Sequence, residues 1–128
     1  MRVLLDTHTF LWFVSGNDRL SEKAQALISD PATEPLLSVA SVWEMAIKIS
    51  LGKLTIAAPF HTFVLTHLQR NGVLLLGISV DHATHVVGLP FHHRDPFDRL
   101  LVAQALVEGV PVVGADPALD AYGVRRIW

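Results

Sequence analysis

Residues 2–14, RVLLDTHTFLWFV, place an aspartate between a short apolar run and a helical pattern. The run Val3–Leu5 is apolar without alternation, which is typical of a strand that is buried on both faces of a sheet. The residues from Thr9 to Ser15 predict a helix, and Asp6 stands at the junction between the two elements. This order predicts the first half of a βαβ unit, provided that the same pattern recurs along the chain.

The pattern does recur, because short apolar runs alternate with helical spacing to the end of the chain. The runs that predict strands are Arg2–Leu5, Pro35–Ser38, Val73–Ser79, Pro111–Gly114 and Gly123–Trp128. Helices are predicted at about Thr9–Ser15, Ser21–Ser29, Val39–Leu51, Pro59–Asn71, Val80–Gly88 and Pro96–Glu108, with a short turn from Pro117. We therefore predict an α/β fold whose short, mostly parallel, five-stranded sheet is flanked by helices. The last strand, GVRRIW, is the most polar and is expected at an edge of the sheet.

The composition predicts one domain over residues 1–128 and excludes several classes of protein. Apolar residues make up 51% of the chain and charged residues 17%, which is typical of a folded domain. The mean hydropathy of +0.41 is high, yet no apolar run approaches the ~20 residues that span a bilayer. We assign the excess apolar surface to the buried sheet and to a subunit or partner interface, and we expect no membrane association.

Cysteine content and net charge restrict the function further. The chain has no cysteine, which excludes disulfides and thiolate metal sites and fits a reducing cytoplasm. The N-terminus lacks the apolar region of a signal peptide. A net charge of −2 gives no global basic footprint for nucleic acid, although a divalent cation on several carboxylates would supply positive charge locally.

Four acidic residues, dispersed along the sequence, are predicted to meet at one edge of the sheet. Asp6 ends the first predicted strand and Asp116 the fourth, whereas Glu44 and Asp98 lie near the starts of predicted helices. In a parallel sheet with right-handed crossovers, the strand carboxyl ends and the helix N-termini that follow them face the same edge. The sequence therefore predicts a crevice that is lined by these four carboxylates.

Each of these acids also fits an ordinary role in helix capping. Asp6 fits an N-cap, Ser41-x-x-Glu44 has the form of a capping box, and Asp116 precedes Pro117 as an N-cap precedes a first-turn proline. In HHRDPFDRLL, residues 92–101, Asp95 fits the N-cap and Asp98 the acidic third position. The two interpretations are compatible, since a helix N-terminus both stabilises and orients a carboxylate.

The chemistry expected of such a crevice is that of a hard divalent cation. Mg²⁺ takes oxygen ligands in octahedral geometry and retains several waters, so three or four carboxylates suffice without histidine or cysteine. A bound cation lowers the pKa of water and stabilises the leaving alkoxide in phosphodiester hydrolysis. Two alternatives are a phosphatase with Asp6 as the nucleophile and a non-catalytic α/β interaction module whose acids are only caps.

Four stretches together resemble one family, the PIN-domain ribonucleases, and within it the VapC-type toxins of type II toxin–antitoxin pairs. The stretches are LLDTHTFLW, SVASVWEMAIK, DPFDRLLVAQAL and VVGADPAL, and they cover essentially the whole chain. By position, Asp6, Glu44, Asp98 and Asp116 resemble the four family acids, and Thr7 resembles a hydroxyl residue that supports the metal site. Ala115 departs from the Thr or Ser that often precedes the fourth acid.

The resemblance implies more than the residues alone can show. It implies a three-layer PIN-like fold, Mg²⁺ or Mn²⁺ as the cofactor, RNA as the substrate and a homodimer. It also implies a small VapB-like antitoxin whose C-terminal segment fills the active-site groove, and contact with DNA only through that antitoxin.

Several other residues have competing interpretations. Asp95 is interpreted first as an N-cap and second as a member of the metal site, and the neighbouring Arg94 and Arg99 as partners of acids or of RNA phosphate. His82 and His85 have the spacing H-x-x-H, for which a solvated face or a helix-end contact is favoured over a zinc site. Aromatic residues expected in the core or in an interface are Trp12, Phe13, Trp43 and Phe97. Basic residues expected on the solvated surface, with contact to RNA as the alternative, are Lys48, Lys53, Arg70, Arg125 and Arg126.

Overall fold

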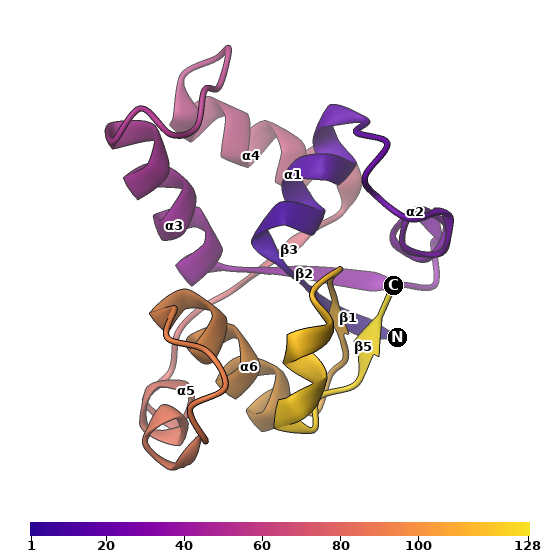
Figure 1. Cartoon of the computed structure of the whole chain (residues 1–128). Helices are drawn as coiled ribbons and strands as arrows, with labels where there is room; N and C mark the ends of the chain where they lie inside the picture. The colour runs from indigo at the N-terminus through magenta and orange to yellow at the C-terminus, as the bar shows by residue number, and fades with distance from the viewer.

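Five short strands form one central sheet in the computed structural model, which describes all of residues 1–128 (Figure 1). The strands are β1 (Arg2–Leu5), β2 (Glu34–Ser38), β3 (Leu74–Leu76), β4 (Val112–Val113) and β5 (Arg126–Ile127). Their order across the sheet is β3-β2-β1-β4-β5, and every neighbouring pair is parallel. The prediction of a five-stranded parallel sheet with the last strand at an edge is confirmed.

Helices follow the strands at nearly the predicted positions. They are α1 (Thr7–Ser15), α2 (Glu22–Ser29), α3 (Val39–Ser50), α4 (Phe60–Asn71), α5 (Val80–His85) and α6 (Pro96–Glu108), with 3₁₀ helices η1 (Val86–Gly88) and η2 (Pro117–Tyr122). The segment predicted as one helix over Val80–Gly88 thus changes from an α-helix to a 3₁₀ helix at Val86.

The strand residues divide between two apolar cores, one on each face of the sheet. Val3 and Leu5 of β1 belong to the core that includes Phe10 and Met45, whereas Leu4 between them belongs to the core that includes Val102. This division follows from the two-residue period of a strand, which points successive side chains to opposite faces. Figure 1 shows the result as three layers, with α1 and α4 on one side of the sheet and α5 and α6 on the other.

Three strands, β3, β4 and β5, are shorter than predicted, because a strand needs a partner along its length. The strand predicted at Val73–Ser79 pairs only from Leu74 to Leu76, since its neighbour β2 ends at Ser38, where α3 begins. Likewise, the edge strand β5 pairs through only two residues, because β4 has only two to offer. The apolar runs in the sequence predicted the positions of these strands. They did not predict the strand ends, which depend on where the neighbouring strands stop.

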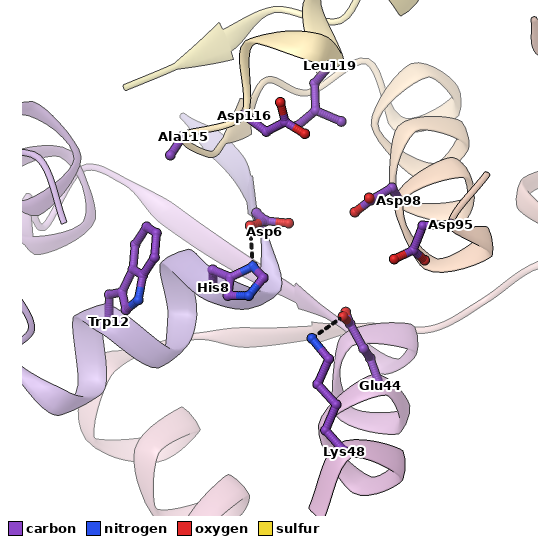
Figure 2. A pocket seen from close by; sticks show the side chains of 10 residues that line it. All are labelled: Asp6, His8, Trp12, Glu44, Lys48, Asp95, Asp98, Ala115, Asp116 and Leu119. Carbon is purple, nitrogen blue, oxygen red and sulfur yellow. Dashed lines mark ion pairs between the residues drawn. The ribbon is translucent and has the colours of Figure 1, made fainter. Parts of the chain in front are cut away.

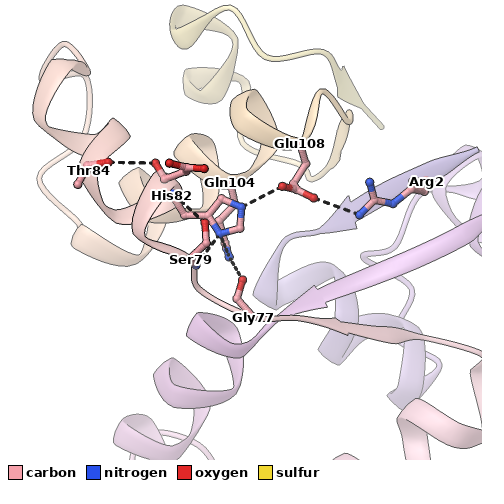
Figure 3. A network of polar contacts seen from close by, with 8 residues as sticks. Arg2, Gly77, Ser79, His82, Thr84, Gln104 and Glu108 are labelled. Carbon is pink, nitrogen blue, oxygen red and sulfur yellow. Dashed lines mark hydrogen bonds and ion pairs between the residues drawn. The ribbon is translucent and has the colours of Figure 1, made fainter.

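A polar network ties α5 to α6 and to the start of β1 (Figure 3). His82 is buried, its Nδ1 accepts the Ser79 backbone N–H at 3.0 Å, and its Nε2 lies 3.1 Å from Glu108 Oε2. Glu108 also pairs with Arg2 at 3.3 Å, and both contacts lower the pKa of Glu108, that of His82 the more. For His82 the helix-end interpretation is confirmed and the solvated-face interpretation is wrong, because both ring nitrogens are engaged inside the protein.

The site predicted from the acids lies where the strand order reverses direction. The chain passes from central β1 to β2 and β3 on one side, and β4 and β5 pair on the other side. Parallel α/β sheets place ligands at the carboxyl ends of the strands at such a point. Separately, none of the helices is both long and apolar enough to cross a membrane.

Candidate functional site

Asp6 directly follows β1 and holds the N-cap position of α1, yet its carboxylate makes no capping hydrogen bond. Its backbone N–H donates to the Val113 carbonyl at 3.0 Å, which fixes it against the end of β4. Gly114 relieves crowding at this contact, because a Cβ there would lie 3.3 Å from the Cβ of Asp6, closer than an ordinary van der Waals contact. The interpretation of the Asp6 side chain as a helix cap is therefore wrong. Its Oδ2 instead lies 3.7 Å from His8 Nδ1, and the carboxylate raises the pKa of His8.

Glu44 lies in the second turn of α3, not in a capping box. The helix begins at Val39, and its cap is Ser38, whose hydroxyl accepts the Ala40 N–H at 3.0 Å. The predicted Ser41–Glu44 capping box is therefore wrong. Glu44 is buried instead between two partners, since its Oε1 accepts the Thr7 hydroxyl at 2.8 Å and its Oε2 lies 2.9 Å from Lys48 Nζ.

Thr7 reaches Glu44 from the first residue of α1 and is itself buried. Its hydroxyl is also 2.8 Å from the Ser41 hydroxyl. A hydroxyl has one proton to donate. Because Glu44 takes that of Thr7, Ser41 is the donor to Thr7. This relay from α3 through α1 and back to α3 fixes one oxygen of Glu44.

Asp95 and Asp98 both lie at the start of α6 but differ in role, because only Asp95 caps the helix. Asp95 caps α6, accepting the Phe97 N–H at 2.8 Å, and Pro96 is the first helical residue, so this prediction is confirmed. Asp98, one turn further, closes no capping box. Its partial burial, together with the charges of Asp95, Asp6 and Glu44, raises the pKa of Asp98 to about 6.

Asp116 follows β4 and caps η2, as predicted, because its Oδ1 accepts the Ala118 N–H at 3.0 Å. Its Oδ2 lies 3.3 Å from His93 Nε2. The Ala118 N–H, and after it His93, lower the pKa of Asp116. His93 is held in turn by Tyr122, whose hydroxyl accepts the His93 backbone N–H at 2.8 Å and whose ring stacks on the imidazole.

The four acids and Asp95 line a single cavity of about 340 Å³ (Figure 2). Figure 2 shows Asp6 at the centre, Asp116 on one side, Asp95 and Asp98 together on α6, and Glu44 on α3. The other lining residues are His8, Trp12, Lys48, Ala115 and Leu119. The predicted convergence of acids from four parts of the sequence is thus what the fold produces, with Thr7 buried behind Glu44.

The donor set of this cavity fits a hard divalent cation. Five carboxylates face it, and the basic side chains among its lining residues are Lys48, which is paired with Glu44, and His8. Such an excess of carboxylate oxygens in a partly buried space matches the ligand preference of Mg²⁺ or Mn²⁺. As the side chains stand, no three converge closely enough to ligate one ion. Binding would therefore require that the carboxylates be drawn together, and no capping hydrogen bond holds the Asp98 side chain.

Other predicted residues took different places. Arg99 is buried, and its guanidinium donates to the carbonyls of Pro90, Val86 and Leu89 at 2.8, 3.2 and 3.3 Å, so neither the predicted pairing with acids nor RNA contact is correct for it. Trp43 is 62% exposed, so the prediction that it lies in the core is wrong and the prediction that it lies in an interface stays a prediction. Trp12 lies at the cavity and contacts the ring of His8.

Two histidines near the acids were not predicted as part of the site. His8 stands two residues after Asp6, in the first turn of α1, and a side chain in that turn can reach the carboxylate that precedes the helix. His93 lies in a loop, and its contact with Asp116 depends on a stacking partner 29 residues away. The contact of His8 could have been predicted from its spacing of two residues from Asp6. The contact of His93 could not, because Asp116 and Tyr122 are distant in the sequence.

Comparison with known proteins agrees with this geometry. The PIN domain family matches residues 3–124, which is nearly the whole chain. The chain belongs to the PIN-domain family. A curated relative, Ribonuclease VapC22 of Mycobacterium tuberculosis, is 32% identical over 132 aligned residues that cover 98% of each chain. The PIN-domain matches and the three-layer architecture confirm the predicted family.

Solved structures show the same PIN fold at lower sequence identity. The chain matches VapBC2 from Rickettsia felis, bound to a promoter DNA fragment, with a TM-score of 0.73 and 11% identity over 99% of this chain and 98% of that one. It matches a toxin–antitoxin complex from Klebsiella pneumoniae with a TM-score of 0.58 and 22% identity over 89% and 86%. At these identities the likeness shows the fold alone.

Proposed function

We propose that this PIN domain is the VapC-type ribonuclease toxin of a type II toxin–antitoxin pair, hydrolysing RNA phosphodiester bonds. The observation that carries the proposal is the single cavity into which four separate elements bring Asp6, Glu44, Asp98 and Asp116. Family membership and a ribonuclease relative that aligns over 98% of the chain support it.

In this proposal Asp6, Glu44, Asp98 and Asp116 hold Mg²⁺ or Mn²⁺. When bound, the cation supplies an activated water and neutralises charge on the phosphate. Thr7 orients Glu44 through its 2.8 Å hydrogen bond and is a positioning residue. Asp95 keeps its capping bond and adds negative potential beside Asp98, which favours the cation without direct ligation.

The proposed partners follow from the structural neighbours. One matched structure is a toxin–antitoxin complex and another is VapBC2 bound to promoter DNA, which supports a small VapB-like antitoxin as the physiological partner. The further elements of this proposal are a homodimer, contact with promoter DNA only through the antitoxin, and action on RNA in the cytoplasm. The excess of exposed apolar side chains, Trp43 among them, is consistent with surfaces that other chains cover.

The alternative of a non-catalytic module rests on the two acids that do cap helices, Asp95 and Asp116. It leaves the other three unexplained, because Asp6 and Asp98 cap nothing and Glu44 is buried beside a hydroxyl relay. Burying a carboxylate costs stability, and placing three of them around one cavity without a role is unfavourable. This imbalance favours the metal-dependent enzyme.

The test is RNA cleavage by the purified chain in Mg²⁺, Mn²⁺ or EDTA. We expect cleavage of structured RNA with either metal, none in EDTA, and loss in Asp6→Asn with the circular dichroism spectrum unchanged. The matched control is Asp18→Asn, which makes the same substitution at an exposed acid outside the cavity. Full metal-dependent cleavage by Asp6→Asn would overturn the site, and metal-independent binding without cleavage would favour the module.

A further inference from the structure

A second groove of about 450 Å³ continues directly from the acidic cavity. Glu44, Lys48 and Asp95 line both spaces, so the two share a wall. From there the groove runs between the C-terminal half of α3 and the start of α6. Its remaining lining residues are Ile47, Leu51, Lys53, Arg94, Pro96 and Phe97.

Basic side chains gather in this groove although the chain as a whole carries a net charge of −2. Lys53 and Arg94 are exposed and form no ion pair, in contrast to Lys48, which is engaged by Glu44. Lys53 is held by the turn that ends α3, where its backbone N–H donates to the Lys48 carbonyl at 2.8 Å and Gly52 adopts a positive φ of 72°. Two unpaired cations thus stand on opposite walls of one groove.

An aromatic ring also lines the groove. Phe97 lines the groove and is half-buried, and Trp43 contacts it edge-on with the ring centroids 5.7 Å apart. A ring held in this way offers a face on which a nucleobase can stack. Cations that follow a phosphate backbone, combined with an aromatic platform, are the usual means of binding single-stranded nucleic acid.

We propose that the RNA strand leaves the catalytic cavity through this groove, with Lys53 and Arg94 contacting backbone phosphates and Phe97 stacking on a base. The inference rests on the proposed ribonuclease function and names the path of its substrate. Charge complementarity selects RNA as the occupant, because the strand whose phosphate lies at the carboxylates must continue past one of the cavity walls. Beyond the wall that is formed by Lys48 and Asp95 lies the groove that carries the unpaired cations Lys53 and Arg94.

The experiment measures binding of a fluorescein-labelled 20-nucleotide single-stranded RNA by anisotropy, in Mg²⁺ and at several salt concentrations. All proteins carry Asp6→Asn so that cleavage does not interfere. The test variant adds Lys53→Ala and Arg94→Ala, and the matched control adds Arg19→Ala and Lys23→Ala, which remove two exposed, unpaired cations outside the groove. A third variant, Lys53→Arg with Arg94→Lys, retains both charges.

We expect the test variant to bind the RNA about tenfold more weakly. We also expect the slope of log K against log salt to become less steep by about 1.4, which corresponds to the loss of two phosphate contacts on a single strand. The control and the charge-retaining variant keep both values. Equal loss in test and control variants, or no recovery with the charges retained, would overturn the inference. So would unchanged RNA binding accompanied by weaker binding of a poly-glutamate peptide, because that result assigns the groove to an acidic protein.

Failure of this inference is distinguishable from failure of the proposed function. If the wild-type chain cleaves RNA with Mg²⁺ and the test variant binds like the control, only the path of the strand is wrong. If the wild-type chain does not cleave RNA at all, the proposed function itself is wrong.

Discussion

The geometry of Glu44 depends on a relay of hydroxyl groups that lies behind the cavity. Ser41 and Thr7 hydroxyls are 2.8 Å apart, and Thr7 is 2.8 Å from Glu44 Oε1, all of them buried. Buried polar groups that satisfy one another fix a single arrangement, and loss of one member leaves the others unpaired. Neither contact is visible in the sequence, because Thr7 and Ser41 lie 34 residues apart.

We predict that Thr7→Val lowers the rate of RNA cleavage without unfolding the protein. Valine has nearly the shape of threonine but cannot donate to Glu44, so the carboxylate loses its orientation. Removing such an orienting partner typically costs about 10- to 100-fold in metal affinity or activity. Steady-state kinetics together with a Mn²⁺ titration should show a lower kcat and a weaker metal midpoint. Thr7→Ser, which keeps the hydroxyl, should recover most of the rate, and a valine variant of wild-type activity would refute the positioning role.

Asp98 provides a prediction in which stability and activity change in opposite directions. Its pKa is raised to about 6 in the folded protein from an ordinary value of 3.8, chiefly by burial. The folded state therefore binds this proton more tightly than the unfolded state. Asp98 has no effect on stability below about pH 4, where it is protonated in both states. As the pH rises from about 4 to about 6 it increasingly destabilises the fold, and above about pH 6 the full cost is present.

We expect Asp98→Asn to raise the free energy of unfolding at pH 7 by about 1–2 kcal/mol in EDTA, after allowance for the exposed part of the side chain. The gain should vanish below about pH 4, and RNA cleavage should be lost at every pH. Denaturant unfolding at several pH values measures this, with Asp18→Asn as the control. A variant that is less stable than wild type at pH 7 would contradict the electrostatic description.

Among the elements, the segment that leads to α6 is held by one buried cation. Arg99 donates to three backbone carbonyls of residues 86–90 and lies 4.2 Å from the centre of the Phe91 ring. These contacts hold the loop that brings His93 and Asp95 to the site. Sequence reasoning placed Arg99 on the surface, because nothing in the local pattern shows that a helix residue faces a loop that folds back onto it.

We predict that Arg99→Met destabilises the protein by about 2–3 kcal/mol, because buried carbonyls lose their donors. Arg99→Lys should recover little, since an ammonium cannot reproduce the planar fork of the guanidinium. Urea unfolding measures the loss, and amide hydrogen exchange should show faster opening of residues 86–91. A loss below about 0.5 kcal/mol in the methionine variant would show that the carbonyls find other partners.

The elements themselves were largely predictable from local patterns. Caps and turn residues carry their signal within a few positions, and so Asp95 with Pro96 and Asp116 with Pro117 were assigned correctly. The ends of β3, β4 and β5 were not predictable, because they depend on where the neighbouring strands stop. The false capping box at Ser41 arose because Ser38, three residues earlier, offers the same chemistry and takes the cap.

For the molecule as a whole, the topology explains why a chain of net charge −2 gathers five of its 12 acidic residues around one cavity. Parallel strands deliver Asp6 and Asp116 to the same edge, and the following helices bring Glu44 and Asp98 to it. This convergence was predictable, since it depends only on strand direction. The contacts of Lys48, His8 and His93 with these acids were not, because they depend on side-chain direction after the fold has formed.

The most direct test of the metal-binding cavity is the melting temperature of the wild-type chain and of Asp6→Asn, each in Mn²⁺ and in EDTA. A ligand at 100 times its Kd stabilises the fold by about 2.7 kcal/mol. We therefore predict that saturating Mn²⁺ raises the Tm of the wild-type chain by several degrees and leaves that of Asp6→Asn unchanged. A wild-type Tm that neither Mn²⁺ nor Mg²⁺ moves, or an equal rise in Asp6→Asn, would contradict a metal site built on these carboxylates.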